Sequence, residues 1–298
     1  MHEAVTTRPV WPEGVRLLLG IGAQKAGTSW VHHNLRAHPA CRPGPMKELH
    51  YFDYVAGNKR TGRVLRNRKS HLLAVMGRKD RIAGVQRLSE ICEAPDDNHQ
   101  SYVDLMTDGL RPGQVAIDIT PSYMTLKAEH FQTMAGLGDT RFLLLLREPV
   151  ARLWSAIRMR MAKKIDDETQ FEAACQELLD RIIDEGDGRE IAKGDYAKAL
   201  SRLKRAVPDE RLLVLFFEDL FCQQSLDRIC AFLEIAPHPM RAQEPVNAGQ
   251  RARMRPDQEH ALAALLRPQY DAVRAAFGST VPQAWHARFA EPAPKVMT

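Results

Sequence analysis

The stretch VRLLLGIGAQKAGTSWVHHNLRAH, residues 15–38, decides how the fold begins. Residues 15–22 form an apolar run that ends in glycine, which is the pattern of a parallel strand covered on both faces. After a short loop, the spacing of the apolar residues predicts a helix over 28–38, with Pro39 beyond its end. A buried strand followed by a loop and a helix is half of a βαβ unit.

Three further apolar runs follow along the chain, with helical patterns between them, at residues 115–119, 142–146 and 212–217. This alternation predicts the α/β class, with a doubly wound, central parallel sheet flanked by helices. Later helices are predicted from Pro149 onward, over 225–235, and over 256–277 with a break near Pro268. We expect a single domain over 15–298, preceded by an N-terminal extension of residues 1–14.

The composition limits the classes of protein to consider. The chain has 298 residues, of which 44% are hydrophobic and 27% charged, as is ordinary for a soluble globular protein. Its net charge of +5 favours anionic ligands. The sequence has neither a signal peptide pattern nor an apolar stretch near the roughly 20 residues that span a bilayer, so we expect a cytoplasmic protein without a membrane span. Five cysteines without CxxC spacing predict free thiols rather than disulfides or a zinc site.

Residues 58–87 carry ten lysines and arginines against a single acid, Asp80. One interpretation is a solvated helical face, and the other is a basic wall near an anionic acceptor. Nucleic acid is not expected as a partner, because no aromatic residue is interleaved for base stacking.

The loop at residues 22–29 lies where the first strand meets the first helix. Unpaired backbone N–H groups and the helix dipole form an anion site at such a junction, and small residues let the backbone approach a ligand. Lys25 precedes Gly27 here, whereas the GxxxxGK[ST] loop of ordinary nucleotide hydrolases has its lysine after the second glycine. A lysine and two hydroxyls at the helix start favour phosphate binding over a generic turn.

The sequence QKAGTSW of this loop resembles the PKxGTTW loop that binds the 5′-phosphosulfate in sulfotransferases. The resemblance implies a P-loop-like sulfotransferase fold that uses 3′-phosphoadenosine 5′-phosphosulfate (PAPS) and releases adenosine 3′,5′-bisphosphate (PAP). Lys25 would then bond the 5′-phosphate and the bridging oxygen. Trp30 would stack on adenine or pack in the core. The implied donor-binding residues of this loop are Gln24, Lys25, Ala26, Gly27, Thr28, Ser29 and Trp30.

A second motif begins at Arg147, at the carboxyl end of the predicted strand over 141–146, where ligands collect in open α/β sheets. The sequence REPVARLWS resembles the 3′-phosphate motif R-[DEN]-P-x-x-R-x-x-S of the same family. Arginine offers a planar fork suited to phosphate, and Ser155 follows Arg152 by three positions, so both can face one side of a helix. The resemblance implies that Arg147 and Ser155 bind the 3′-phosphate; the alternative is a strand-capping arginine and a surface serine.

A third element, VNAGQRAR at residues 246–253, resembles the glycine-containing loop that closes over the nucleotide. The resemblance implies donor contacts from Gly249, Gln250 and Arg251, and a basic surface loop is the alternative.

The sequence PMKELHYFD, residues 45–53, resembles the KE-x-HFF-D segment of heparan-type and many bacterial sulfotransferases. An attacking hydroxyl needs its proton removed, and the resemblance implies that Glu48 removes it. If residues 47–52 are extended, the side chains of Glu48 and His50 project to the same face. His50 is then a competing base or a partner that orients Glu48, and a structural ion pair is the alternative. The implied catalytic residues are Lys25, Glu48 and His50.

The sequence DITPSY, residues 118–123, resembles the EK-[ST]-P-x-Y segment of the same branch, with Ile119 in place of the lysine. That lysine can contact an acidic acceptor in sugar-modifying relatives, so a heparin-like substrate is not favoured. Two further landmarks, at 194–197 and 212–220, extend the likeness over most of residues 15–255.

These observations predict a transferase that moves a sulfuryl group from PAPS to a hydroxyl or amine of a small-molecule or glycan acceptor. A lipid-linked glycan or a peptide also stays open as acceptor. No metal is expected, because no cluster of His, Cys or carboxylate residues has ligand spacing. One alternative is a nucleotide-dependent kinase with Asp118 holding magnesium, against which the position of Lys25 argues. Another is an inactive nucleotide-binding scaffold, against which the intact Glu48 and His50 argue.

Overall fold

The computed structural model describes residues 8–58, 79–186, 188–241 and 250–289. A parallel five-stranded sheet lies at the centre, with the strand order β2-β3-β1-β4-β5. β1 lies between β3 and β4, and six of its seven residues are buried, as its apolar run predicts. The predicted α/β class with a central parallel sheet is confirmed. The strands are β1 (Arg16–Gly22), β2 (Cys41–Pro43), β3 (Val115–Ile119), β4 (Asp139–Leu146) and β5 (Leu212–Phe216).

Two strands differ from the sequence-based prediction. The edge strand β2 was not predicted, because three residues are too few to show a hydrophobic period. β4 begins at Asp139, three residues before the predicted apolar run. The first residues of β4 are polar, but they also pair with β1, since Asp139 lies opposite Arg16.

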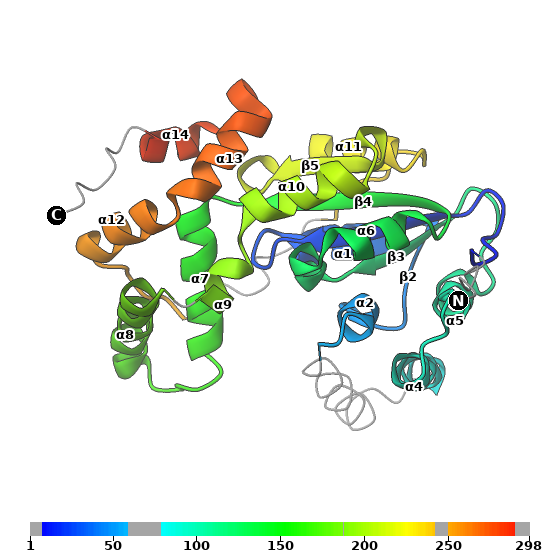
Figure 1. Ribbon diagram of the computed structural model, residues 1–298, viewed down its shortest axis with the longest axis horizontal. Helices are drawn as coiled ribbons and strands as arrows, with labels where there is room; N and C mark the ends of the chain where they lie inside the picture. The colour runs from blue at the N-terminus through cyan, green and yellow to red at the C-terminus, as the bar shows by residue number, and fades with distance from the viewer. Residues whose placement is uncertain (1–7, 59–78, 187, 242–249, 290–298) are drawn as a thin grey trace, which may run out of the picture.

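Helices surround the sheet (Figure 1). α6 and α10 lie together on the near face of the view, and α7, α9, α8 and α12 gather beyond one end of the sheet. The α-helices are α1 (Thr28–Ala37), α2 (Tyr51–Val55), α4 (Lys79–Glu93), α5 (Gln100–Thr107), α6 (Ala128–Ala135), α7 (Pro149–Met161), α8 (Glu168–Glu185), α9 (Gly188–Ala192), α10 (Tyr196–Ala206), α11 (Gln223–Phe232), α12 (Pro256–Leu265), α13 (Arg267–Phe277) and α14 (Gln283–Phe289). The 3₁₀ helices are η1 (Pro121–Thr125), η2 (Asp209–Arg211), η3 (Phe217–Asp219) and η4 (Gly278–Thr280).

The start of α7 matters most for the site, because this helix follows β4 directly. Pro149 occupies its first turn, and the Glu148 carboxylate accepts hydrogen bonds from the backbone N–H groups of Val150 and Ala151. The Tyr270 hydroxyl of α13 also bonds Glu148. The predicted break near Pro268 is confirmed, since α12 ends at Leu265 and α13 begins at Arg267.

The described part of the N-terminal extension packs against the sheet and α5. The Trp11 indole donates to the backbone oxygen of Val15 at 2.6 Å, and its ring lies so close to Gly138 that a Cβ there would clash. The backbone N–H of Val10 donates to the Gln100 side chain. None of the described helices combines the length and the apolarity needed to cross a bilayer. All five cysteines are free thiols.

Candidate functional site

The carboxyl ends of the parallel strands place four chain segments at one edge of the sheet. The phosphate loop, defined here as residues 22–29, follows β1, Thr120 follows β3, and Arg147 follows β4. The 3₁₀ helix η3, which contains Glu218, follows β5. Ligands of open α/β sheets bind at this edge.

The phosphate loop turns sharply into α1. Lys25 and Gly27 have φ angles of 71° and 95°, and a Cβ on Gly27 would lie 2.4 Å from Leu220. Only glycine fits that close approach at a positive φ. The N-cap of α1 is Gly27, so no side chain caps this helix start. The first backbone N–H groups of α1 are thereby left for an anion.

The two predicted phosphate motifs meet through a direct contact. The Arg147 Nη1 donates to the backbone oxygen of Lys25 at 3.0 Å, and the guanidinium lies over the Phe217 ring at 4.1 Å from its centroid. The Tyr196 hydroxyl donates to the backbone oxygen of Arg147 at 2.8 Å. These contacts fix the Arg147 side chain beside the loop before any ligand binds.

Positive charges crowd around Lys25. Burial lowers the pKa of Lys25, and the nearby cations Arg147, Arg158, Lys47 and Lys163 lower it further. Burial also lowers the pKa of Arg147, which Glu218 partly opposes. Like charges held this closely favour the binding of a polyanion, because its negative charge relieves their repulsion.

The remaining residues of the first motif lie in different surroundings. Trp30 is 5% exposed and packs edge-on against Phe221 at a centroid distance of 5.8 Å, so its indole belongs to the hydrophobic core. Ala26 and Thr28 are buried, and Ser29 is exposed. The Gln24 Oε1 is buried without a hydrogen-bond partner among the described residues.

Ser155 and Arg152, both from the second motif, have different surroundings. Ser155 lies on α7 and is 8% exposed. Arg152, which the sequence analysis placed on the same face, is 1% exposed and donates to the backbone oxygen of Glu190 at 3.1 Å. A Cβ on Gly194 would lie 2.3 Å from the Arg152 Nε. Arg152 therefore fixes α9 against α7.

Arg158 was not predicted as a site residue. It follows Ser155 by three positions on α7, and its Nε is buried without a hydrogen-bond partner in the described part of the chain. The spacing from Ser155 could have indicated it, because residues three apart share a helix face.

The third motif and the basic segment are described only in part. Gly249 lies outside the described residues. Gln250 donates to the backbone oxygen of Asp166 at 3.4 Å, and Arg251 is exposed. Residues 59–78, most of the basic segment, also lie outside the described residues.

A cavity of about 570 Å³ connects the phosphate loop to the candidate base. Gln24 reaches it from the loop, and Glu48, His50 and Asp53 line it from the neighbouring segment. The opposite wall includes Arg189 of α9 and Lys193 just after that helix. No sequence motif pointed to those two cations, since only the tertiary fold brings α9 to the cavity.

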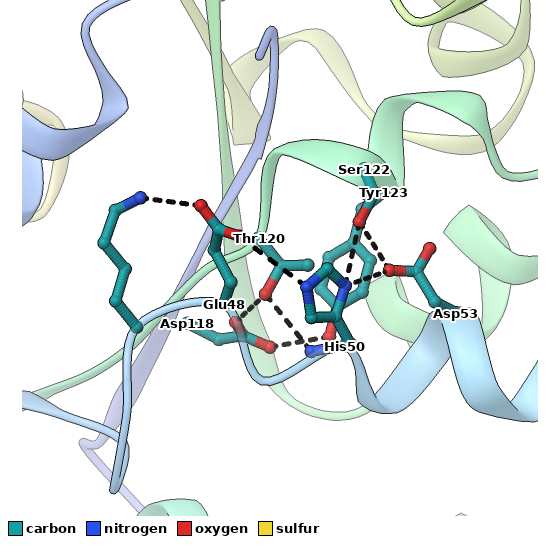
Figure 2. Close-up of polar contacts among 8 residues, drawn as sticks. Glu48, His50, Asp53, Asp118, Thr120, Ser122 and Tyr123 are labelled. Carbon is teal, nitrogen blue, oxygen red and sulfur yellow. Dashed lines mark hydrogen bonds and ion pairs between the residues drawn. The ribbon is translucent and has the colours of Figure 1, made fainter. Parts of the chain in front are cut away.

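The backbone around the candidate base differs from the prediction. Residues 47–52 are not extended, because Glu48 and His50 have φ angles of 61° and 59°, in the left-handed region, and α2 begins at Tyr51. The two side chains nevertheless meet, with 3.7 Å between the Glu48 Oε2 and the His50 Nε2 (Figure 2). A tight turn brings them together where a strand was expected. Left-handed non-glycine residues cost energy and cluster at functional sites.

His50 lies between two carboxylates (Figure 2). Its Nδ1 is 2.6 Å from the Asp53 Oδ2, and the Ser122 hydroxyl donates to the same carboxylate oxygen. Burial alone would lower the pKa of His50, but the hydrogen bonds that Asp53 and Glu48 accept from its ring and their negative charges raise it to about 9. His50 is therefore protonated near neutral pH.

Asp53 and Ser122 are site residues that the sequence analysis quoted but did not select. Asp53 is 2% exposed and ends the motif at 45–53, and Ser122 stands within the motif at 118–123. The spacing of His50 and Asp53, three residues apart at a helix start, was the available indication.

Asp118 does not fit the role that the kinase alternative requires. It is 1% exposed, and its carboxylate accepts hydrogen bonds from the hydroxyls of Thr120, Tyr102 and Tyr123 at 2.6, 3.1 and 2.9 Å. Burial raises the pKa of Asp118, which these hydroxyls partly oppose. Its oxygens are thus enclosed and engaged by protein groups. No group of three or more His, Cys, Asp or Glu side chains within the described ranges is arranged to hold a metal ion.

Comparisons with known proteins agree with this geometry. Three solved structures share the fold: a sulfotransferase from Alicyclobacillus acidocaldarius (22% identity, TM-score 0.57, 94% of this chain and 99% of that chain), the sulfotransferase domain of the Synechococcus PCC 7002 olefin synthase (18%, 0.54, 91% and 97%) and that of the curacin biosynthetic pathway (19%, 0.50, 78% and 77%). No curated protein gives a significant sequence match.

The family comparison covers the elements that build the site. A model of the sulfotransferase family matches residues 18–239, which include the phosphate loop, the Glu48 and His50 turn, and Arg147. The matched range begins within β1 and ends after α11, and so contains most of β1 and all of β2 to β5. The chain therefore belongs to the sulfotransferase family.

Proposed function

We propose that this protein transfers a sulfuryl group from PAPS to a hydroxyl or amine of an acceptor bound in the 570 Å³ cavity. The observation that carries the proposal is that Gln24 of the phosphate loop opens into the same cavity as Glu48 and His50. A donor held by the loop and an acceptor held in the cavity would place their reacting atoms side by side, which removes much of the entropic barrier to transfer.

The residues at the sheet edge fit such a donor. The uncapped start of α1 and the crowded cations around Lys25 favour a ligand with several negative charges. So does the Arg158 Nε, which is buried and unpaired among the described residues. Arg147 would bind the 3′-phosphate through its planar fork, with Ser155 beside it. PAPS supplies a sulfuryl group bound to a phosphate that leaves readily.

Lys25 would stabilise the leaving phosphate. As the acceptor oxygen or nitrogen bonds to sulfur, the bond from sulfur to the bridging oxygen breaks, and negative charge accumulates on that oxygen. A cation already fixed beside it stabilises this charge without further reorganisation. PAP leaves with the electron pair of the broken bond.

Glu48 would take the proton of the acceptor. With a pKa of about 9, His50 holds its own proton at neutral pH, and Asp53 is buried and engaged by His50 and Ser122. Glu48 keeps 27% of its side chain exposed and lines the cavity, so its carboxylate is accessible to an acceptor. The protonated His50 would orient Glu48 through their 3.7 Å contact.

Donor binding is the first test. PAP is expected to raise the melting temperature by mass action, and more strongly than ATP with magnesium.

Arg147→Ala removes a charge-assisted hydrogen bond, of about 1.5–3 kcal/mol, so PAP should bind roughly tenfold or more weakly by calorimetry. The matched control is Arg274→Ala, at an arginine of α13 that pairs with Asp271, and this variant should bind PAP with the wild-type affinity. A clear preference for ATP would refute the choice of donor.

Lys25→Ala tests the leaving-group role. Single-turnover rates with saturating donor are expected to fall on the order of 10²-fold or more, as for the loss of one preorganised donor. Lys198→Ala, at a lysine that is 69% exposed and paired with Asp195, should leave the rate unchanged. Wild-type rates in folded Lys25→Ala would remove Lys25 from the chemistry.

Glu48→Gln tests the base. This substitution keeps size and hydrogen bonding, so PAP affinity should stay near wild type while kcat falls by roughly 10² to 10⁴. His50→Ala should cost less. The assay follows labelled donor with a panel of hydroxyl and amine acceptors. If Glu48→Gln turns over normally and His50→Ala is inactive, His50 is the base.

The protonation of His50 can be tested without an acceptor. Because its pKa is raised from 6.5 to about 9 on folding, its stabilising contribution is fully present below pH 6.5 and is lost as the pH rises through 9. The difference in unfolding free energy between wild type and His50→Gln should therefore shrink from pH 6.5 to 9 in urea titrations. A difference that does not change with pH would contradict the raised pKa.

A further inference from the structure

We propose that Asp118 is a positioning residue, which orients the hydroxyls of Thr120 and Tyr123 so that they hold the turn bearing Glu48 and His50. This proposal rests on the proposed function, because it concerns how the candidate base is held. The turn, residues 44–52, is called the base segment below.

The base segment lies along β3, to which two backbone hydrogen bonds join it. The N–H of Gly44 donates to the oxygen of Ile117 at 3.0 Å, and the N–H of Glu48 donates to the oxygen of Ile119 at 3.2 Å. Both acceptors lie on β3, which is fixed in the sheet by pairing with β1 and β2. The first part of the base segment thus has a rigid support.

Beyond Glu48 the support changes from backbone oxygens to side-chain hydroxyls. The N–H of His50 lies 3.5 Å from the Thr120 Oγ1 (Figure 2). The N–H of Phe52 lies 3.4 Å from the Tyr123 hydroxyl. Both hydrogen bonds are long, so their strength depends on how well each hydroxyl lone pair is aimed. A hydroxyl rotates freely unless a second partner fixes its proton.

Asp118 supplies that second partner. Thr120 donates to the Asp118 Oδ1 at 2.6 Å, and Tyr123 donates to the Oδ2 at 2.9 Å. Each hydroxyl has a single proton, so donation to Asp118 leaves only its lone pairs for the backbone N–H groups. A carboxylate is required, because an amide at this position would present N–H groups to hydroxyls that must donate.

The conformation that depends on this support is unfavourable. Glu48 and His50 both have left-handed backbone angles, which are strained for a non-glycine residue. Without the two hydroxyl contacts, the segment should relax and separate the Glu48 carboxylate from His50. A displacement of about 1 Å at a catalytic group can lower a rate by on the order of 10²-fold.

Single hydroxyl deletions separate this role from general stability. Thr120→Val and Tyr123→Phe each remove one contact to the base segment, and Thr120→Ser keeps the hydroxyl. Tyr102→Phe removes a third hydrogen bond to Asp118. Within the described residues the Tyr102 hydroxyl bonds that carboxylate alone, so this variant loses no contact to the base segment. Thr140→Val is the matched control for Thr120→Val. Thr140 lies in β4 and is equally buried, at 0% exposure, but its Oγ1 is unpaired among the described residues.

Three measurements are made on each variant: kcat and KM for sulfuryl transfer, PAP affinity by calorimetry, and the pKa of His50 by NMR, with its signal assigned from His50→Gln. Thr120→Val and Tyr123→Phe should lower kcat by roughly tenfold to 10²-fold. Both should leave PAP affinity at the wild-type value and move the pKa of His50 from about 9 toward 6.5. Thr120→Ser should restore kcat and the His50 pKa, and Thr140→Val and Tyr102→Phe should change neither.

The proposal is overturned if Thr120→Val and Tyr123→Phe keep the wild-type His50 pKa and kcat, or if Tyr102→Phe lowers kcat as much as they do. If Thr120→Val fails to fold, Tyr123→Phe and Thr120→Ser still decide the question. If the proposed function itself is wrong, the result is different, because the wild-type protein then transfers no sulfuryl group. The His50 titration then tests the role of Asp118 by itself.

Discussion

The parallel arrangement of the five strands is the constraint on which the rest of the structure depends. Since β1 pairs with β3 on one side and β4 on the other, the segments after these three strands leave the sheet at one edge. Lys25 and Arg147 are 122 positions apart in sequence, yet a 3.0 Å hydrogen bond joins them. The sheet determines where these loops begin, and it contributes the buried carboxylate of Asp118 near the end of β3.

Burial acts on Lys25 and His50 in the same direction, but their neighbours decide the outcome. Removal from water disfavours any cation, and for Lys25 the surrounding cations add to that effect, so its pKa is lowered. His50 has carboxylates on both sides, and its pKa rises to about 9 in spite of burial. The site therefore holds excess positive charge where a donor phosphate would lie, and a neutralised cluster of charges where an acceptor would give up its proton.

Hydrophobic periodicity was enough to predict most of the fold. The apolar runs at β1, β3, β4 and β5 are long and buried, and Pro149 marks the start of α7. The three-residue strand β2 has no period of its own and depends on pairing with β3. The eighteen-residue helix α8 was not predicted either, although its buried residues Phe171, Cys175, Leu178, Leu179 and Ile182 follow a helical spacing.

The candidate site was predictable where a short motif carries it. The phosphate loop and Arg147 lie together as their motifs indicated. The left-handed turn at Glu48 and His50 could not be predicted, because their preferred conformations are extended or helical and the turn depends on contacts with residues near 120. The spacing of Arg158 from Ser155 on α7 could have indicated that residue. Arg189 of α9 and Lys193, just after that helix, stand in no motif, and only the tertiary fold brings them to the cavity.

The cavity receives its positive charge from residues other than position 119. Ile119, which stands where the similar motif has lysine, is 2% exposed, and its side chain fills the space above Gly20, where a Cβ would lie 2.9 Å from it. Position 119 is therefore part of the core and gives the cavity no charge. Besides His50, the cations that line the cavity within the described ranges are Arg189 and Lys193, and Lys193 is partly neutralised by Glu190 at 3.1 Å. Arg152 of α7 bonds the backbone oxygen of Glu190 in α9. The helix α7, which also carries Ser155, therefore determines where Arg189 and Lys193 lie.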